Sequence, residues 1–394
     1  MDYRFTPEEE AFRARARAFL KENLPKDWHG IYPDAYFHEE YWSFVRGFTS
    51  KMARLGWLTM AWPREYGGQD LPVMQQVVLN EELGYNRAPH RDVSIGVNMA
   101  GPTVMLHGTE EQKKKFLRPI ATTEHIYAQA FSEPGAGSDL ASLETLAVRD
   151  GDEYVINGSK LWTSGAHRST HLWLLTRTDP RAPKHKGISM FVLPLDSPGI
   201  TIRPVLNPLN VHYTNQVFFD HVRVPAANRV GPENRGWYVA TTTLDFERAG
   251  AGRFAAAQRA IEDVTMLAKE TRWNGGVAWD NPIYRHALAD IAVANHAGKM
   301  VGYRVAWMQS KGLIPNQEAS AAKLMASEIA QRVAQVGVRL LGLYGQVDRG
   351  SKYAALEGHV MADYVTTISF TIRGGTSEVQ RNIIAQRGLG LPRS

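Results

Sequence analysis

The 394-residue chain contains no cysteine. This absence excludes disulfides, thiolate nucleophiles and cysteine-ligated metal or iron–sulfur sites. Long apolar runs are also missing, since no stretch approaches the roughly 18 residues that span a bilayer. The chain opens on charged Asp2 and Arg4 instead of an apolar signal core. We therefore expect a cytoplasmic protein with no targeting segment and no membrane partner.

Neither sign of charge dominates, because the chain has 45 basic and 40 acidic residues. The basic residues are scattered, so nucleic acid is not an expected partner. Two short basic clusters, at 13–17 and 113–115, either attract an anionic ligand or, as is commoner, form solvated helix faces. The 13 histidines show no HExxH spacing, so no metal site is expected.

The first 120 or so residues have a helical pattern. Segments 6–9 (TPEE) and 109–112 (TEEQ) are capping boxes, which predict that a helix begins at each. Between them, segment 62–68 (WPREYGG) is expected to be a loop, because its proline and paired glycines break regular elements.

From about residue 127 to 230 the pattern changes to strands. The dipeptides Asp150-Gly151 and Asn157-Gly158 predict hairpin turns on either side of a strand at 153–156. Further strands are expected at 188–195, 200–205 and 217–224.

After residue 236 the helical period returns. It is clearest in the spacing of four apolar residues, Ile329, Val333, Val336 and Leu340. The order helix, strand, helix predicts an α+β protein with segregated layers. We expect an all-α domain at 1–124, a small antiparallel β-barrel or sandwich at 125–235 and a helical domain at 236–394.

Segment 131–139 (FSEPGAGSD) crowds two hydroxyls, two acids, two glycines and a proline into one turn. Glycine lets backbone N–H groups approach a ligand, and successive N–H groups in a turn suit anionic or electron-rich atoms. A ligand cradle and a tight polar connection between strands are both consistent with this segment alone. We expect Glu133 and Asp139 to be structural acids that stabilise the turn.

A second segment, 159–166 (SKLWTSGA), places an aromatic residue before two hydroxyls and a glycine. A planar, heteroatom-rich ring can stack on the indole of Trp162 and hydrogen-bond to Ser164. Gly135 and Gly137 are followed neither by a third glycine nor by Gly-Lys-Ser/Thr, so the chain lacks a Rossmann fingerprint and a P-loop.

A third segment, 372–385 (IRGGTSEVQRNIIA), has two glycines that open onto a helix start. An exposed helix N-terminus favours anions and can direct N–H groups at a carbonyl oxygen. An ordinary capped helix is the alternative for this segment alone.

Together with segment 244–248 (LDFER), these three segments closely resemble the acyl-CoA dehydrogenase family over nearly the whole chain. Further matching motifs are 62–68, 81–84 (EELG) and 222–225 (VRVP). The resemblance implies helical N-terminal, middle β and C-terminal four-helix-bundle domains, with FAD as cofactor. It also implies a homotetramer, or dimer of dimers. The implied reaction is α,β-dehydrogenation of an acyl-CoA thioester, with electrons passed to electron-transferring flavoprotein.

The catalytic base departs from the commonest family pattern. Many members place a glutamate directly before the Gly-Thr of the third segment, and Gly374 occupies that position here. A minority, resembling the isovaleryl- and long-chain enzymes, carry the base within Leu-Asp-x-Glu-Arg, and that residue is Glu247. Its alternative role is a helix-face acid paired with Arg248 or Arg253. The resemblance also implies that the Gly374 N–H polarises the thioester oxygen.

The other matching positions are cofactor and thioester contacts. The cofactor contacts that the resemblance implies are Phe131, Ser132, Ser138, Trp162, Thr163, Ser164, Arg272, Arg339, Gly342, Thr376 and Glu378. The implied substrate contacts are Ser138, Asp245, Arg248 and Gly375.

Three residues depart from the family pattern. Arg339 and Leu343 replace a frequent glutamine and glycine, and Arg373 stands where a small or aromatic residue is expected. Arg373 either meets a substrate carboxylate, orients Glu247, or faces solvent or a phosphate.

Three functions are open at this point. The first is an active FAD-dependent dehydrogenase, with an acyl-CoA oxidase as its close variant. The second is a subunit of a hetero-oligomeric dehydrogenase, as in relatives acting on sterol-derived side chains, in which a partner completes half of each FAD site. The third is a flavin-free scaffold.

Overall fold

The computed structural model describes residues 4–247 and 250–392, with the backbone alone for 242–247. The chain divides into two compact units. The helical unit comprises residues 1–33, 72–88 and 248–394, and the sheet unit comprises 34–71 and 89–247. Segments of the N-terminal region thus belong to both units, and the three predicted domain boundaries stay a prediction.

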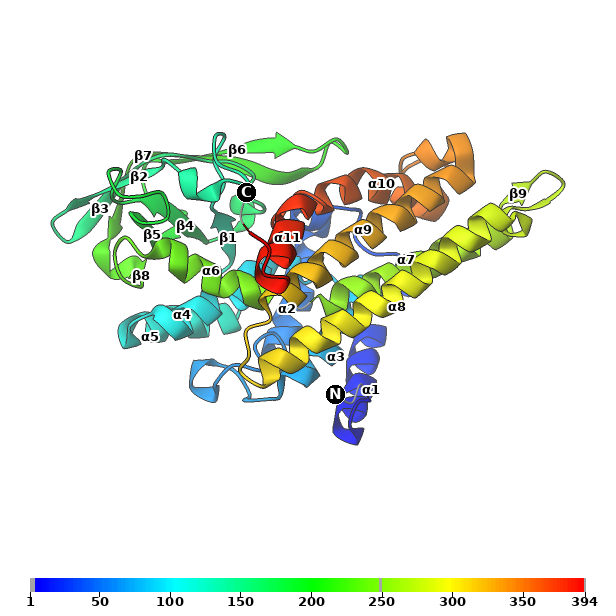
Figure 1. Ribbon diagram of the computed structural model, residues 1–394, viewed down its shortest axis with the longest axis horizontal. Coiled ribbons are helices and arrows are strands. Elements are labelled where there is room, and N and C mark those ends of the chain that lie inside the picture. Colours follow the sequence, from blue (N-terminus) through cyan, green and yellow to red (C-terminus); the bar gives the residue numbers. More distant parts are fainter. Residues whose placement is uncertain (1–3, 248–249, 393–394) are drawn as a thin grey trace. The chain divides into compact units, whose positions relative to one another are not determined.

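In the helical unit, α7, α8, α9 and α10 pack along one another (Figure 1). The helices of this unit are α1 (Pro7–Asn23), α3 (Val73–Tyr85), α7 (Ala251–Glu270), α8 (Pro282–Ser310), α9 (Asn316–Leu341), α10 (His359–Phe370) and α11 (Ser377–Ile383). A short hairpin, β9 (Arg272–Trp273) and β10 (Gly276–Val277), joins α7 to α8. The four apolar residues of the predicted helical period are all buried on α9: Ile329, Val333, Val336 and Leu340. The helical C-terminal domain is thereby confirmed.

Both predicted helix starts are confirmed at the level of the cap. Thr6 Oγ1 accepts from the Glu9 N–H at 3.2 Å, while the Glu9 carboxylate accepts from the Thr6 N–H at 2.7 Å. Thr109 and Gln112 make the same reciprocal pair. Each cap satisfies two N–H groups that have no partner within the helix, so the helix begins there.

The basic cluster on α1 is only partly solvated. Arg15 and Arg17 are exposed as expected, but Arg13 is buried, so the prediction of a solvated face is wrong for it. The Arg13 guanidinium lies 3.0 Å from Glu81 on α3, and Tyr303 on α8 donates to the same carboxylate. Burying Arg13 is tolerated because the charge has a hydrogen-bonded partner.

Gly84 is the point at which α3 packs closely on α7. A Cβ at this position would lie 2.1 Å from the carbonyl oxygen of Gly252, a backbone atom that no rotamer change can move. We expect Gly84→Ala to lower the free energy of unfolding by about 3 kcal/mol, the upper end of ordinary overpacking, measured by urea denaturation. The control is Gly47→Ala on α2 (Glu39–Arg54), where a Cβ meets nothing within 4 Å. It should raise stability slightly, since alanine favours helix; equal effects at the two glycines would contradict the packing argument.

The sheet unit contains eight strands and four α-helices within its described residues. Its strands are β1 (Tyr127–Ala130), β2 (Leu146–Asp150), β3 (Glu153–Lys160), β4 (His171–Arg177), β5 (Ile188–Pro194), β6 (Ile200–Leu206), β7 (His212–Pro225) and β8 (Arg229–Val230). Its helices are α2 (Glu39–Arg54), α4 (Gly101–His107), α5 (Glu110–Ala121) and α6 (Gly236–Glu247).

The strands form one sheet in the order β6-β7-β3-β2-β4-β5-β8, with β1 on β4. Most neighbours are antiparallel as predicted, but β4 pairs in parallel with both β1 and β2. The sheet is therefore mixed. Parallel pairing requires a long connection, and residues 131–170 between β1 and β4 provide it, with the β2–β3 hairpin inside.

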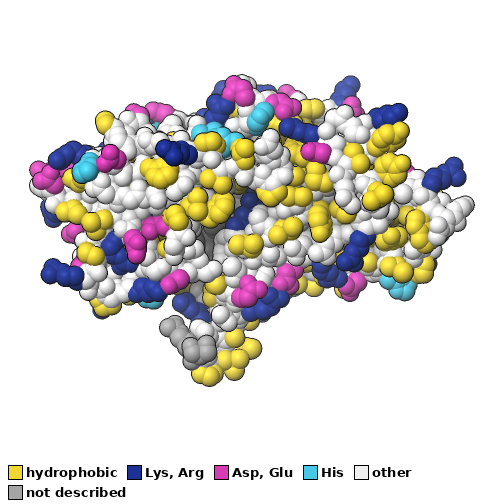
Figure 2. Space-filling view, turned by 90° about the horizontal axis from the view of Figure 1, so that it is seen from above, with side chains coloured by type: hydrophobic (Ala, Val, Ile, Leu, Met, Phe, Trp, Pro, Cys, Tyr) yellow, Lys and Arg dark blue, Asp and Glu magenta, His cyan; other side chains and the backbone are white. Residues whose placement is uncertain are grey.

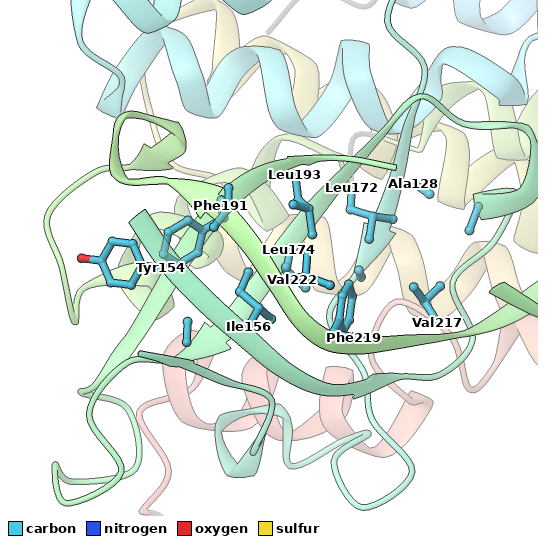
Figure 3. Packing of buried hydrophobic residues seen from close by; sticks show 14 residues of the cluster. Ala128, Tyr154, Ile156, Leu172, Leu174, Phe191, Leu193, Val217, Phe219 and Val222 are labelled. Carbon is cyan, nitrogen blue, oxygen red and sulfur yellow. The ribbon is translucent and has the colours of Figure 1, made fainter. Parts of the chain in front are cut away.

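The core of this unit draws side chains from six strands, β1 to β5 and β7 (Figure 3). Phe191 and Leu193 of β5 point toward Ile156 of β3 and Phe219 of β7, and all four are almost fully buried. Strands remote in the sheet order thus contribute to one core, which supports the predicted closed β domain.

The predicted turn at Asn157-Gly158 is wrong. Strand β3 runs through both residues, and its pairing with β7 shifts register there as a β-bulge. Gly158 has φ +139°, and the Asn157 side chain accepts from the His221 N–H at 2.8 Å. The glycine therefore serves a bulge, the other conformation that Asn-Gly suits within a strand.

Figure 2 shows basic and acidic side chains interspersed over the face that it draws. No helix in the described ranges combines the length and apolarity needed to cross a membrane. Within those same ranges, no three histidine, aspartate or glutamate side chains gather as a metal site requires.

Candidate functional site

The loop 131–139 follows β1 and is stabilised by the buried carboxylate of Glu133. The Glu133 N–H donates to the Ala136 carbonyl oxygen at 3.0 Å, and the reverse bond measures 3.1 Å. The Glu133 side chain accepts from the N–H groups of Glu144 at 2.7 Å and Thr145 at 2.9 Å. This confirms the prediction that Glu133 stabilises the turn.

Sequence reasoning missed Lys160, which is fully buried at the end of β3. Its Nζ donates to the Phe131 carbonyl oxygen at 3.0 Å and to Glu133 Oε1 at 2.7 Å. The alternation from Tyr154 and Ile156 already places Lys160 on the inward face of the strand. An inward lysine signals a buried partner, and here that partner is the loop.

Burial and ion pairing shift the pKa values of Lys160 and Glu133 in opposite directions. Burial lowers the pKa of Lys160 to about 8, although pairing with Glu133 opposes the shift. For Glu133, burial acts to raise the pKa, but Lys160 and the hydrogen bonds from 144 and 145 outweigh it and hold the pKa below its usual value. Each charge is thus tolerated only because the other is present.

The C-terminal half of the loop carries free backbone donors. Among the described residues, the N–H groups of Gly137, Ser138 and Asp139 have no hydrogen-bond partner. A Cβ at Gly135 or Gly137 would meet no atom within 4 Å. The Asp139 carboxylate is exposed and pairs with Lys184, so its role in stabilising the turn stays a prediction. The loop therefore has the open N–H groups of an anion-binding turn.

Segment 159–166 lies beside this loop. The Leu161 N–H donates to the Ser132 carbonyl oxygen at 2.8 Å, which brings together two of the three predicted segments. Trp162 has φ +64° and is 58% exposed. Its indole therefore keeps an open face, as the stacking hypothesis requires.

The amide N–H groups of this segment alternate between paired and open. Those of Leu161, Thr163 and Gly165 donate to backbone carbonyl oxygens. Those of Trp162 and Ser164 have no partner in the part of the chain that the structure describes. Thr163 Oγ1 is buried and also lacks a partner among those residues. A planar ring with acceptor atoms along its edge suits this arrangement.

The Gly374-Gly375 turn is stabilised by side chains that donate hydrogen bonds to its carbonyl oxygens. Both glycines have positive φ, +68° and +87°. Gln380 Nε2 donates to both carbonyl oxygens at 3.3 Å, and the buried Lys323 donates to that of Gly375 at 2.7 Å. Within the described residues, neither glycine N–H has a partner. With its carbonyls engaged, the turn has donors to offer a ligand.

Thr376 and Glu378 complete the cap of α11. Thr376 Oγ1 accepts from the Val379 N–H at 3.2 Å. Glu378 is exposed, and its own backbone N–H together with the Thr376 hydroxyl holds its pKa below the usual value. The ordinary cap predicted as the alternative is thus present, directly after the open glycine turn.

The adenine-side candidates lie at the other end of α9. Arg339 is exposed in the last helical turn, Gly342 has φ +57°, and Leu343 is 83% exposed. Lys323, which contacts the glycine turn, is about 24 Å away along the helix at 1.5 Å per residue. The structure therefore separates these candidates from Thr376 and Glu378. Arg272 begins the exposed β9 hairpin.

The remaining candidates concern the base and its neighbours. Asp245 and Glu247 belong to α6, but their side chains are outside the described part, and Arg248 lies outside the described residues altogether. The guanidinium of Arg373 stacks 4.4 Å above the Phe370 ring. The roles proposed for Glu247, Asp245, Arg248 and Arg373 stay predictions.

Comparisons with known proteins cover most of the chain. Family models match at 6–124 (acyl-CoA dehydrogenase, N-terminal domain), 128–222 (middle domain) and 234–389 (C-terminal domain). Acyl-CoA dehydrogenase FadE26 of Mycobacterium tuberculosis is 35% identical, over 99% of this chain and 98% of its own.

Two solved structures cover 100% of this chain and 100% of their own. The Tcur3481-Tcur3483 steroid ACAD is 36% identical with a TM-score of 0.89. The ChsE4-ChsE5 complex from Mycobacterium tuberculosis is 35% identical with a TM-score of 0.88.

Proposed function

Since the chain belongs to the acyl-CoA dehydrogenase family, FAD-dependent oxidoreductases that act on CH–CH groups, we propose that it converts an acyl-CoA thioester to the 2-enoyl-CoA. The observation that carries this proposal is the alternation of N–H groups at 161–165 beside an open indole. In a segment that only connects two strands, the backbone N–H groups are normally hydrogen-bonded within the protein. Here every second N–H group is left without a partner, which suits the edge of a bound ring that carries acceptor atoms.

The residues of the chain fit the cofactor of the family. Trp162 offers a face for a flat ring, and the N–H groups of Trp162 and Ser164 offer donors for its edge. The residues proposed to hold FAD are Phe131, Ser132, Ser138, Trp162, Thr163, Ser164, Arg272, Arg339, Gly342, Thr376 and Glu378. When bound, FAD would supply the hydride acceptor for the substrate's β-hydrogen.

Removal of the substrate's α-proton depends on residues of the protein. An α-C–H beside an unpolarised thioester is too weak an acid for a carboxylate, so the thioester oxygen needs a donor. The open N–H of Gly374 is proposed to be that donor, a contribution of about 3 kcal/mol on the scale of oxyanion-hole groups. Glu247 then takes the α-proton. Ser138, Asp245, Arg248 and Gly375 are proposed to contact the CoA thioester.

The assembly and the electron acceptor belong to the same proposal. The resemblance favours a homotetramer that reduces electron-transferring flavoprotein, and we propose that it acts in the cytoplasm. The alternative is one subunit of a hetero-oligomer, and it is favoured by the ChsE4-ChsE5 neighbour, itself a complex. Arg339 and the exposed Leu343, where the family commonly has glutamine and glycine, also support it.

Colour and mass distinguish these possibilities. We expect the purified chain to be yellow with stoichiometric FAD, to run as a homotetramer in light scattering, and to bleach anaerobically with an acyl-CoA. The panel should include straight, branched and steroid side-chain acyl groups. A colourless chain that gains FAD only with a second polypeptide would establish the heteromer. A flavin-loaded chain that no member of the panel bleaches would contradict dehydrogenase activity.

A further inference from the structure

Asn215 of β7 is fully buried and bound to the residue that follows Trp162. The Thr163 N–H donates to the Asn215 carbonyl oxygen at 3.0 Å, and the Asn215 N–H donates to the Thr163 carbonyl oxygen at 3.1 Å. The side-chain Nδ2 of Asn215 donates to that same Thr163 oxygen at 2.9 Å. One asparagine therefore makes three hydrogen bonds to a single residue of the Trp162 segment.

Two histidines complete the surroundings of this amide. His212 Nε2 lies 2.7 Å from Asn215 Oδ1, and His167 Nδ1 lies 3.1 Å from Asn215 Nδ2. The two imidazoles stack with centroids 3.7 Å apart and an interplanar angle of 20°. The Phe37 ring packs edge-on against His167 at 6.0 Å.

The backbone settles which way the amide faces. The Thr163 carbonyl oxygen can only accept, so the side of the amide that faces it must be Nδ2. Oδ1 then faces His212, which must donate from a protonated Nε2. The second hydrogen of Nδ2 points at His167 Nδ1, which must therefore carry a lone pair. His167 is thus neutral, with its proton on Nε2.

The environment of His167 supports the neutral form. Burial lowers its pKa to about 4, and the neighbouring His212 and Arg168 act in the same direction. A hydrogen bond to the backbone of Phe37 acts the other way, as expected when the ring N–H is the donor. At neutral pH His167 therefore keeps the acceptor role that the orientation of the Asn215 amide demands.

Trp162 explains why such a network is needed. Its φ of +64° is a conformation that residues with a side chain rarely adopt, and it persists only where the surroundings enforce it. We propose that Asn215, oriented by His167 and His212, is the positioning residue that holds Trp162 in this conformation, so that its indole and N–H are ready for the flavin. This inference rests on the flavin role proposed for Trp162.

A flavin-free measurement tests the positioning itself. Trp162→Gly removes the cost of the left-handed conformation, so it should raise the melting temperature of the apoprotein by about 2–4 °C, the shift for one stabilising kcal/mol in a unit of this size. In an Asn215→Asp background the segment is held less firmly, because a carboxylate cannot donate to the Thr163 carbonyl and only the two backbone hydrogen bonds remain. There Trp162→Gly should give a clearly smaller rise.

FAD affinity of the apoprotein is the second readout. Asn215→Asp should raise the Kd for FAD about tenfold, the equivalent of one lost hydrogen bond. His212→Phe keeps the stacked ring but removes its N–H, and should act in the same direction; it replaces Asn215→Asp if that variant does not fold. The control is Asn157→Asp at the β3 bulge, where the side chain only accepts, and its Kd should stay within about twofold.

The two readouts separate failure of the inference from failure of the proposed function. If the wild type binds no FAD either alone or with a second polypeptide, the proposed function fails, and the melting temperatures still decide the role of Asn215. If Trp162→Gly raises the melting temperature equally with and without Asn215, the positioning role is overturned. An unchanged Kd for FAD in both Asn215→Asp and His212→Phe would overturn it as well.

Discussion

Replacing Glu247 by glutamine should lower the rate of flavin reduction by an acyl-CoA by at least about two orders of magnitude, the usual scale for a general base. Glutamine keeps the size and the hydrogen-bonding reach of the side chain but cannot take the α-proton. FAD content should therefore stay at the wild-type level while the anaerobic stopped-flow rate collapses. Gly374, which occupies the commoner base position, has no group that can compensate.

The control for this experiment is Glu144→Gln, because Glu144 is an exposed acid on the same chain. Its rate should match the wild type within about twofold. A near-normal rate in Glu247→Gln would place the base on another residue. A loss of FAD together with the rate would instead indicate a structural role for Glu247.

Replacing Lys160 by methionine should strongly destabilise the sheet unit. Methionine fills similar space but leaves the buried Glu133 carboxylate without its cation, and breaking a buried ion pair from one side costs about 3–5 kcal/mol. The Phe131 carbonyl also loses its donor. We expect a lower urea midpoint for the sheet unit, and a lower FAD content because loop 131–139 is no longer held.

A second substitution identifies the cause of that loss. Adding Glu133→Gln to Lys160→Met removes the stranded charge while keeping an oxygen that accepts from the 145 N–H, so part of the lost stability should return. Lys186→Met, at an exposed lysine, should change the free energy of unfolding by no more than about 0.5 kcal/mol. If the double variant is as unstable as the sum of its parts, the ion pair is not the reason.

The sequence predicted helices and strands well where the residues that interact are close together in the chain. Thr6 and Glu9 form their capping box within three residues, so the same helix start is visible in sequence and structure. The α9 core positions follow from period alone. Asn157-Gly158 shows the limit: a hairpin turn and a bulge both suit Asn-Gly, and pairing with β7 selected the bulge.

The candidate site was predicted as three motifs, and the structure added the residues that support them. Lys160, Asn215 and Lys323 have no motif of their own, because their function depends on which backbone carbonyls they meet. The same limit applies to Arg13. Its partner Glu81 is 68 residues away, so the sequence pattern showed only a basic helix face.

The sequence by itself determined the family, the absence of cysteine chemistry, the order of helical and β segments and the motifs that are proposed to surround a flavin and a thioester. These depend on residue identity and on contacts within a few positions. Only the tertiary structure decided that β4 pairs in parallel with two strands, that Arg13 is buried, and that alternate N–H groups beside Trp162 stay open. Each of these depends on a partner distant in the chain, such as the Thr163–Asn215 pair, 52 residues apart, and distant partners meet only when the whole chain is folded.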